Sequence, residues 1–341
     1  MKSENSWAAL RAIRAHLSST GLTSESAAVP QLPLVFLDSV LRGIGQVMLQ
    51  NNSYAGLLFL IGIFYNSVLF GFAVLVGAVA STATAVLLGV ARSSVRAGLF
   101  GFNGSLVAIA LLYFLEPELL TWGYVVLAAA CTTVVMAALL NLLSTWKIPA
   151  LTAPFILVTM LFILACARFG RLNSTDVLPT AGLPKAAAVE GIVTFSTIVE
   201  GLFNGVAQVF FQGAAMTGVF FVAGLLISSR VAGVAALLGS FVGLLVAWGL
   251  GAAEPAIRAG AFGFNSVLTA IALGSGIFVL NAASVAYGTL AVVATAIVFA
   301  AMSAALEPLG MPALTAPFVI VVWLFLLASP LFPQIRTVAS R

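Results

Sequence analysis

The chain has 341 residues, of which 62% are hydrophobic and 7% charged, and its mean hydropathy is +1.18. No water-soluble domain of this length can hide so much apolar surface, so the composition excludes a soluble protein and predicts residence in a lipid bilayer. The net charge of +4 comes from basic residues scattered between apolar runs. Loop basicity of a membrane protein explains this pattern, and no basic patch for nucleic acid is present.

Residues 1–30 are the only long polar stretch and are predicted to be a polar N-terminal tail or a short interfacial helix. Trp7, Leu10, Ile13 and Leu17 fall roughly on one helical face, as such a helix requires. The only histidine, His16, lies in this stretch and is interpreted as a solvated residue. No continuous apolar segment follows the early charges, so we do not expect a cleavable signal peptide.

A first unit follows at residues 31–167 and opens with an apolar piece, 31–50, that carries Asp38 and Arg42. Polar side chains make this piece a poor full span, so it is predicted to enter the membrane inside protein and return to the same side. Five uncharged apolar runs come next, each long enough for a spanning helix. They lie at 54–72, 73–91, 98–115, 121–143 and 148–167.

A polar linker at residues 168–190 separates this unit from a second one at 191–335. The second unit also opens with a polar-tipped apolar piece, 192–212, which contains Glu200 and Gln208. Five apolar runs again follow, at 213–229, 231–253, 259–280, 281–306 and 308–333. The runs read as helices because a membrane segment must satisfy its own backbone hydrogen bonds. The predicted fold class is therefore all-α, with ten transmembrane helices and two re-entrant half-helices.

Three motifs occur twice in the same order, which identifies the two units as copies. Gly-Phe-Asn recurs at 101–103 and 263–265, and Gln-Val at 46–47 and 208–209, each 162 residues apart. Pro-Ala-Leu-Thr-Ala-Pro-Phe recurs at 149–155 and 312–318, 163 residues apart. Three doubled motifs at nearly one offset predict a duplication, with the functional site where the copies face each other.

Five spans per copy is an odd number, so the second copy is predicted to insert with inverted topology. If both termini are cytoplasmic, nine basic residues lie on the cytoplasmic side and four lie outside, as the positive-inside rule favours. The linker at residues 168–190 then also lies outside. An inverted repeat places a shared pore near the membrane midplane, at the interface of the two copies.

The residues exclude most catalytic chemistry. There is no phosphate-binding loop, no Ser-His-Asp set and no zinc-spaced His/Cys set, so we expect no enzyme, no catalytic residue, no metal and no cofactor. Cys131 and Cys166 are interpreted as small apolar residues. No ionisable residue lies within the bodies of the ten runs, which argues against ion coupling. Amides, hydroxyls and phenyl rings in the doubled motifs instead suit a small, neutral, hydrogen-bonding solute.

With its doubled Leu-Thr-Ala-Pro-Phe and Gly-Phe-Asn motifs and its Gly-Gln-Val-Met-Leu-Gln-Asn-Asn string, the chain resembles the urea transporter family in its bacterial form, from about residue 36 to 333. The resemblance implies passive conduction of urea through a narrow slot of phenylalanine pairs beside a row of oxygen acceptors. It also implies a homotrimer with one pore per protomer, embedded in lipid in the cell inner membrane.

The resemblance also assigns the pore-lining residues. Phe102 with Leu49 would form the outer slot, and Phe264 with Phe211 the inner one. The remaining expected pore residues are Gln46 and Gln208 with the carbonyls near Val47 and Val209 for the oxygen row, and Leu106, Leu268, Thr152 and Thr315 for the centre. Thr152 lies only a few residues into its run, near a membrane face, whereas the resemblance places it at the pore centre.

Two departures from the family pattern concern the slot and the oxygen row. Leu49 stands where the family often has phenylalanine, and Gln208 stands where some bacterial members have glutamate. Two alternatives stay open. One is a channel for other small neutral amides or ammonia, although the only histidine lies in the tail. The other is an ion-coupled secondary transporter, with Asp38 or Glu200 as its coupling carboxylate.

Overall fold

A computed structural model of the chain describes residues 21–22, 32–184 and 188–338, and these residues are helical with no β-sheet. The predicted N-terminal helix and His16 lie outside the described residues. In the first half the helices are α2 (Leu32–Gln46), α3 (Ser53–Asn66), α4 (Val68–Leu87), α5 (Arg92–Arg96), α6 (Phe102–Phe114), α7 (Leu119–Leu143), η1 (Ser144–Trp146) and α8 (Ala153–Cys166).

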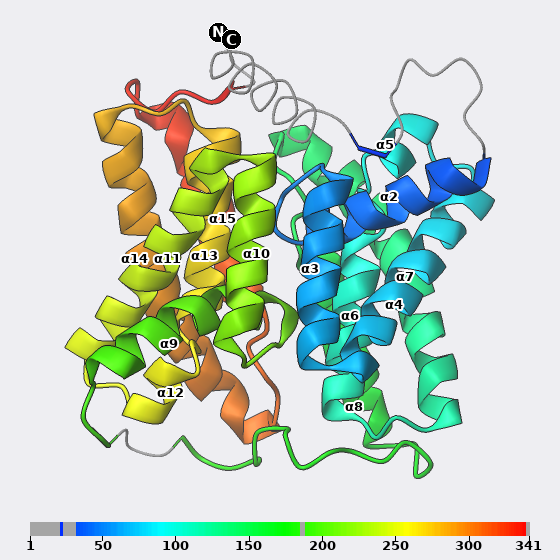
Figure 1. The fold of residues 1–341 in the computed structure, drawn as a ribbon, viewed down its shortest axis with the longest axis horizontal. Coiled ribbons are helices and arrows are strands. Elements are labelled where there is room, and N and C mark those ends of the chain that lie inside the picture. Colours follow the sequence, from blue (N-terminus) through cyan, green and yellow to red (C-terminus); the bar gives the residue numbers. More distant parts are fainter. Residues whose placement is uncertain (1–20, 23–31, 185–187, 339–341) are drawn as a thin grey trace, which may run out of the picture.

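In the second half they are α9 (Phe195–Ala207), η2 (Gln208–Phe210), α10 (Ala215–Ser228), α11 (Arg230–Gly249), α12 (Glu254–Arg258), α13 (Gly263–Ile271), a π-helix η3 (Ala272–Ile277), α14 (Ala282–Leu306), η4 (Glu307–Leu309), α15 (Ala316–Ala328) and η5 (Ser329–Leu331). Every predicted apolar run overlaps one of these helices, although several helices begin before the predicted start of the run. The described parts of the linker, 168–184 and 188–190, hold no helix and run along one end of the molecule (Figure 1).

The element order of the first half recurs in the second. α4 and α11 each have 20 residues, and α7 and α14 each have 25. Left-handed backbone conformations recur as well, at the same 162- or 163-residue spacing: Leu49 and Phe211, Gly89 and Gly251, Gly98 and Gly260, Lys147 and Gly310, and Leu151 and Leu314. α2 and α5 lie at one end of the molecule, and α9 and α12 lie at the opposite end (Figure 1).

A single serine separates each pair of adjacent helices near the start of a half. Ser67 is extended (φ −152°), and its side chain accepts a hydrogen bond from the Phe70 N–H at the start of α4. Ser229 does the same for α11, accepting from Ala232. Serine is a preferred N-cap because its oxygen satisfies a free N–H of the first turn. The predicted boundary between the first two runs, at 72/73, is therefore wrong by about five residues.

Apolar helices dominate the described chain, as in a multi-pass integral membrane protein. Five are long and apolar enough to cross a membrane, and six if the bent pair Phe195–Phe210 and Ala215–Ser228, which meet at 73°, forms one span. The five are Val68–Leu87, Leu119–Trp146, Arg230–Gly249, Glu254–Ile277 and Ala282–Leu309. Shorter apolar helices complete the set, at Ser53–Asn66, Phe102–Phe114, Ala153–Cys166 and Ala316–Leu331.

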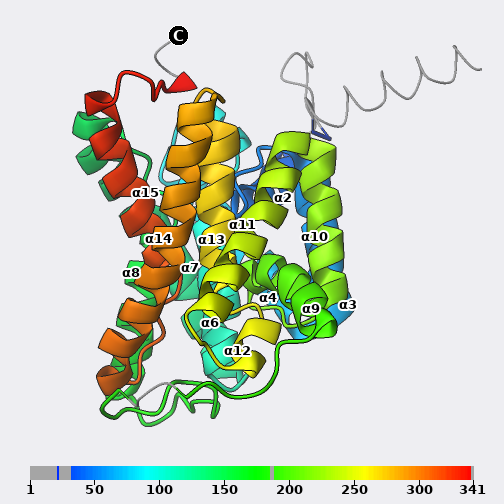
Figure 2. The same cartoon turned by 90° about the vertical axis from the view of Figure 1, so that its left-hand side faces the viewer.

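The two halves meet along α3 and α10, which lie side by side (Figures 1 and 2). The rings of Phe59 and Phe221 touch edge to face, with centroids 5.3 Å apart. Each ring also covers a glycine of the other half. A Cβ on Gly62 would lie 3.3 Å from the Phe221 ring, and one on Gly224 would lie 2.7 Å from the Phe59 ring. Phe59 and Phe221, like Gly62 and Gly224, are 162 residues apart, so the same contact is made twice with the halves exchanged.

Candidate functional site

Helices α8 and α15 both begin inside the protein at the Leu-Thr-Ala-Pro-Phe motif. Leu151 and Leu314 are left-handed (φ 51° and 50°), which turns the chain immediately before each helix. Thr152 and Thr315 are the N-cap residues, and the proline that follows lies in the first helical turn. Proline is tolerated there because no N–H is needed at that position. Within the predicted runs 148–167 and 308–333, the α-helices therefore begin only at Ala153 and Ala316.

The two threonines of this motif meet each other. Their hydroxyl oxygens lie 2.7 Å apart in a hydrogen bond, and the residues are 2% and 3% exposed. Thr152 thus lies in the protein interior against the other half. Its expected place in a pore stays a prediction.

One asparagine in each half holds this turn. Asn103 accepts a hydrogen bond from the Phe155 N–H (3.1 Å) and donates to the Leu151 carbonyl (3.5 Å). Asn265 accepts from the Phe318 N–H (3.2 Å) and donates to the Leu314 carbonyl (3.1 Å). The asparagines therefore close a break between the left-handed leucine and the new helix. The asparagines of the doubled Gly-Phe-Asn motif thus serve the same structural purpose in both halves.

The C-terminal ends of α2 and α9 carry the expected oxygen row. Leu49 N–H donates to the Gln46 carbonyl and Gln50 N–H to the Gly45 carbonyl, and the Phe211 and Gln212 amides repeat this pattern. The helix ends are thus closed by Schellman turns with left-handed Leu49 and Phe211, at φ 61° and 58°. Neither the Val47 nor the Val209 carbonyl accepts a hydrogen bond from the part of the chain that the structure describes. Each half therefore presents a free carbonyl beside a glutamine.

The Gln46 amide is oriented by its neighbour. Its Nε2 donates to the Ala97 carbonyl at 2.9 Å. A carbonyl can only accept, so the amide nitrogen must face it, and the Gln46 oxygen remains available as an acceptor.

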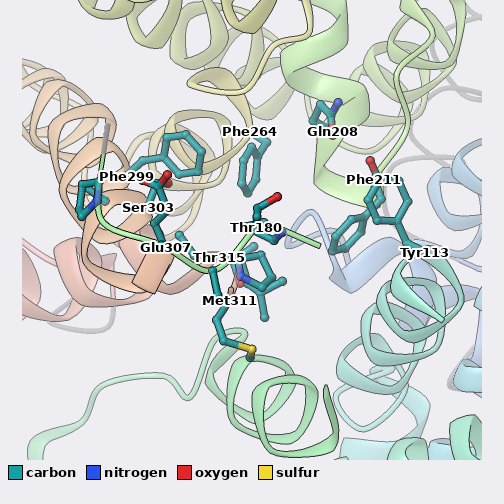
Figure 3. Close-up of a pocket in the computed structure, with 18 of the residues that line it drawn as sticks. Tyr113, Thr180, Gln208, Phe211, Phe264, Phe299, Ser303, Glu307, Met311 and Thr315 are labelled. Carbon is teal, nitrogen blue, oxygen red and sulfur yellow. The ribbon is translucent and has the colours of Figure 1, made fainter. Parts of the chain in front are cut away.

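A cavity of about 650 Å³ brings five of the expected site residues together (Figure 3). They are Gln208, Val209, Phe211, Phe264 and Thr315. They come from the end of α9, from η2, from the start of α13 and from the turn before α15. The cavity therefore runs from the Phe211 and Phe264 rings to the Thr315 hydroxyl.

The other seven expected residues do not line this cavity: Gln46, Val47, Leu49, Phe102, Leu106, Thr152 and Leu268. Leu106 and Leu268 are fully buried, Val47 and Phe102 are 1% and 6% exposed, and Gln46 and Leu49 are partly exposed. Thr152 contacts the cavity's floor through its hydrogen bond to Thr315. The described residues thus place an open space beside Phe211 and Phe264 of the second half.

Sequence reasoning missed several residues of the cavity wall. Tyr113, Phe155 and Phe299 contribute rings, with centroids 5.4 Å (Tyr113) and 6.4 Å (Phe155) from Phe211, and 5.5 Å (Phe299) from Phe264. Residues 179–184 of the linker line the mouth, together with Glu307. The doubled motifs could have indicated only Phe155, which belongs to one of them. Tyr113 and Phe299 correspond to Ser275 and Met136 in the other half, so no repetition marks them.

The position of the linker brings two of the sequence expectations into conflict. The Phe264–Phe211 slot was assigned to the inner side, and residues 168–190 to the outside. Residues 179–184 line the same cavity as Phe211 and Phe264, so the slot lies on the linker side of the molecule. If the linker lies outside the cell, the slot of Phe264 and Phe211 cannot be the inner one.

The carboxylates considered for ion coupling lie elsewhere. Asp38 pairs with Arg42 at 2.9 Å, and Glu200 pairs with Arg258 at 2.9 Å. Neither carboxylate lines the cavity, where Glu307 at the mouth is the only Asp or Glu among the lining residues. Within the described residues, no group of three or more His, Cys, Asp or Glu side chains could hold a metal ion. Apart from Glu307 at the mouth, the lining of the cavity is therefore uncharged, with aromatic rings and a few oxygen acceptors.

Comparison with known proteins identifies the family of the chain. Residues 37–330 match the family model for urea transporters. The chain is 32% identical over 306 residues to urea transporter 1 of Ovis aries, covering 89% of this chain and 79% of that protein. It is 31% identical to urea transporter 1 of Capra hircus and 30% identical to that of Rattus norvegicus over the same coverage.

Proposed function

This chain belongs to the urea transporter family, and we propose that it conducts urea passively across the cytoplasmic membrane, down the urea gradient. A transport protein needs a path rather than reacting groups, and the cavity offers rings and oxygen acceptors without a catalytic set. The observation that carries the proposal is the contact between Thr152 and Thr315, which joins the floor of the cavity in one half to the other half.

The proposed path runs between two inverted repeats of five spans each. The exchanged contacts of Phe59 with Gly224 and of Phe221 with Gly62 support a two-fold relation between the halves. The placement of α2 and α5 at one end and of α9 and α12 at the other supports inversion (Figure 1). α2 and α9, with 15 and 13 residues, would be the half-helices that end at the path, and ten further helices would span the membrane. The repeats would be 31–167 and 191–335.

The orientation follows from charge. α2 and α5 together hold three arginines and one aspartate, whereas α9 and α12 together hold two glutamates and one arginine. Positive charge is retained on the cytoplasmic side. We therefore place the α2 and α5 end, and both termini, in the cytoplasm. Phe211 and Phe264 then form the outer slot, and Leu49 and Phe102 the inner one.

Urea is planar and neutral, and it must leave its hydration shell to pass such a slot. Stripping a polar group of water without replacement costs about 2–7 kcal/mol. The Gln46 and Gln208 side chains, the free carbonyls of Val47 and Val209, and the Thr152 and Thr315 hydroxyls would replace the lost hydrogen bonds. Leu106 and Leu268 would narrow the centre between them. An ion loses far more hydration energy than neutral oxygens return, so the slot would reject it.

Ion coupling is less well supported than passive flow. Asp38 and Glu200 are the coupling candidates, and both are held by arginines away from the cavity. Family likeness also implies a homotrimer with one path per protomer, which light scattering of the purified protein measures directly.

The test is urea flux into proteoliposomes, with thiourea and dimethylurea assayed beside it. Flux should saturate only weakly, follow the urea gradient alone, and continue when sodium and proton gradients are collapsed. Asp38→Asn and Glu200→Gln should leave the flux unchanged when the variants fold. Strict dependence of urea flux on a sodium or proton gradient would refute passive conduction. Flux of ammonia without any flux of urea would show that the chain conducts ammonia instead.

A further inference from the structure

A second open space lies on the outer surface of the second half, away from the proposed path. It has a volume of about 400 Å³ and lies between α11, the end of α13 with its π-helix, and α14. Val234, Leu238 and Val285 form exposed walls, so the space is a groove that opens outward. We call it the α11–α14 groove.

The groove exists because small residues replace large ones at equivalent positions. Gly274, Ser275 and Gly276 stand where the first half has Leu112, Tyr113 and Phe114. A Cβ on Gly274 would meet only the Ala235 Cβ, at 3.7 Å, and one on Gly276 would meet nothing within 4 Å. In the first half the equivalent residues Leu112 and Phe114 carry large side chains that are each 3% exposed, and the Phe114 ring packs against the rings of Tyr113 and Phe211. The glycines at this place in the fold therefore occur in one half only.

One end of the groove carries a positive charge. Arg230, the first residue of α11, is among its lining residues and is exposed. The described residues provide it with no ion pair: the three that they form involve Arg42 and Arg258. No aspartate or glutamate lines the groove. The equivalent position in the first half is Val68, so this charge occurs in one half only.

The length of the groove matches one leaflet of a bilayer. Its lining residues on α11 extend from Arg230 to Val242. At a rise of about 1.5 Å per residue this is about 18 Å. Half of a hydrocarbon core about 30 Å thick is about 15 Å. An acyl chain lying along the groove would thus reach from the bilayer interior to the level of Arg230.

We propose that the α11–α14 groove binds an acyl chain of an anionic phospholipid, with its phosphate headgroup held by Arg230. The apolar walls exclude a polar ligand, and the unpaired guanidinium selects a negative headgroup. The lipid fills the space that Gly274 leaves open, so its binding stabilises the packing of α11 against α14.

The test uses the purified full-length protein in detergent and titrates phosphatidylglycerol or phosphatidylcholine. Bound lipid is counted by native mass spectrometry, and Tm is recorded in parallel. Saturating phosphatidylglycerol should raise Tm by about 2–4 °C, because a ligand of the folded state stabilises it. Arg230→Gln should weaken phosphatidylglycerol binding about fivefold and remove its advantage over phosphatidylcholine. Gly274→Leu, which restores the leucine of the first half, should abolish the Tm rise for both lipids.

Arg92→Gln is the matched control. Arg92 is also an exposed arginine at the first residue of a helix, on α5, but it lies outside the groove. This variant should keep the full phosphatidylglycerol response. If Arg230→Gln binds phosphatidylglycerol as wild type does and shows the same rise in Tm, the proposal is wrong. If Gly274→Leu does not fold, the Arg230→Gln variant alone decides the test. If Gly274→Leu instead changes the oligomeric state and leaves lipid binding intact, the groove holds a second copy of the chain and the proposal is wrong.

Discussion

The side chains of Thr152 and Thr315 donate and accept a hydrogen bond between the two halves, 2.7 Å from oxygen to oxygen and 163 residues apart in the chain. Each threonine occupies the same place in its own half, immediately before the buried start of a helix. A residue that contacts its own counterpart lies on the axis that relates two copies.

Thr152→Val and Thr315→Val should each lower urea flux about fivefold, the equivalent of one hydrogen bond of about 1 kcal/mol, with the oligomer intact. Each single variant also leaves the partner hydroxyl buried and unpaired, which costs about 1–3 kcal/mol of stability. The double variant removes both hydroxyls and should recover much of that stability while conducting least. Flux in proteoliposomes and Tm in detergent measure the two effects separately.

Thr159→Val is the control for these variants. Thr159 is fully buried in α8, and its hydroxyl makes no hydrogen bond in the described structure. Removal of the Thr159 hydroxyl should lower neither the urea flux nor the Tm. Wild-type flux in the Thr152→Val/Thr315→Val double variant would remove the pair from the path.

Leu49→Phe should tighten discrimination against dimethylurea relative to urea, and Phe211→Leu should relax it. Leu49 and Phe211 both have left-handed backbones at equivalent helix ends, so exchanging their side chains adds no new backbone strain. Adding or removing one ring changes the space available for a methyl group in the slot. The ratio of urea flux to dimethylurea flux should therefore change about tenfold. The flux ratio of the two solutes is the measurement, and a ratio that neither variant changes would contradict the slot assignment.

Asn103→Ala should destabilise the protein by about 2–4 kcal/mol, because the buried Phe155 N–H and Leu151 carbonyl both lose a partner. Asn265→Ala should do the same in the second half. Thermal unfolding in detergent measures the loss. Asn141→Ala, on an exposed asparagine of α7, should leave Tm within about a degree of wild type. Equal Tm values for all three variants would show that the asparagines do not hold the turns.

Lys147→Gly should stabilise the protein by about 1 kcal/mol without changing urea flux. Lys147 is exposed and left-handed (φ 55°), and the equivalent residue of the second half is already glycine, Gly310 (φ 63°). Glycine adopts this conformation without the Cβ penalty. The reverse exchange, Gly310→Ala, should destabilise, because its Cβ would lie 2.9 Å from the Pro179 carbonyl oxygen. Tm values of the two variants should therefore move in opposite directions.

The places where helices are interrupted could be recognised in the sequence only as repeated motifs. The doubled Pro-Ala-Leu-Thr-Ala-Pro-Phe stretch marks a place where a helix is interrupted, since proline disfavours a helix interior. It did not show where the new helix begins, and the predicted start at 148 missed the turn at Leu151. Left-handed leucine depends on the Asn103 bonds from another helix, which no local pattern contains.

By itself, the sequence determined that the chain is a membrane protein of apolar helices, that its second half repeats the first, and that its repeated polar groups are neutral. These properties follow from composition, from run length and from a constant offset, all of which are local or periodic along the chain. Only the tertiary structure decided that Thr152 meets Thr315, that Tyr113 and residues 179–184 wall the cavity, and that Gly274 leaves a groove beside Arg230. These depend on how helices distant in the chain pack, because a side chain's neighbours across an interface have no fixed spacing in sequence.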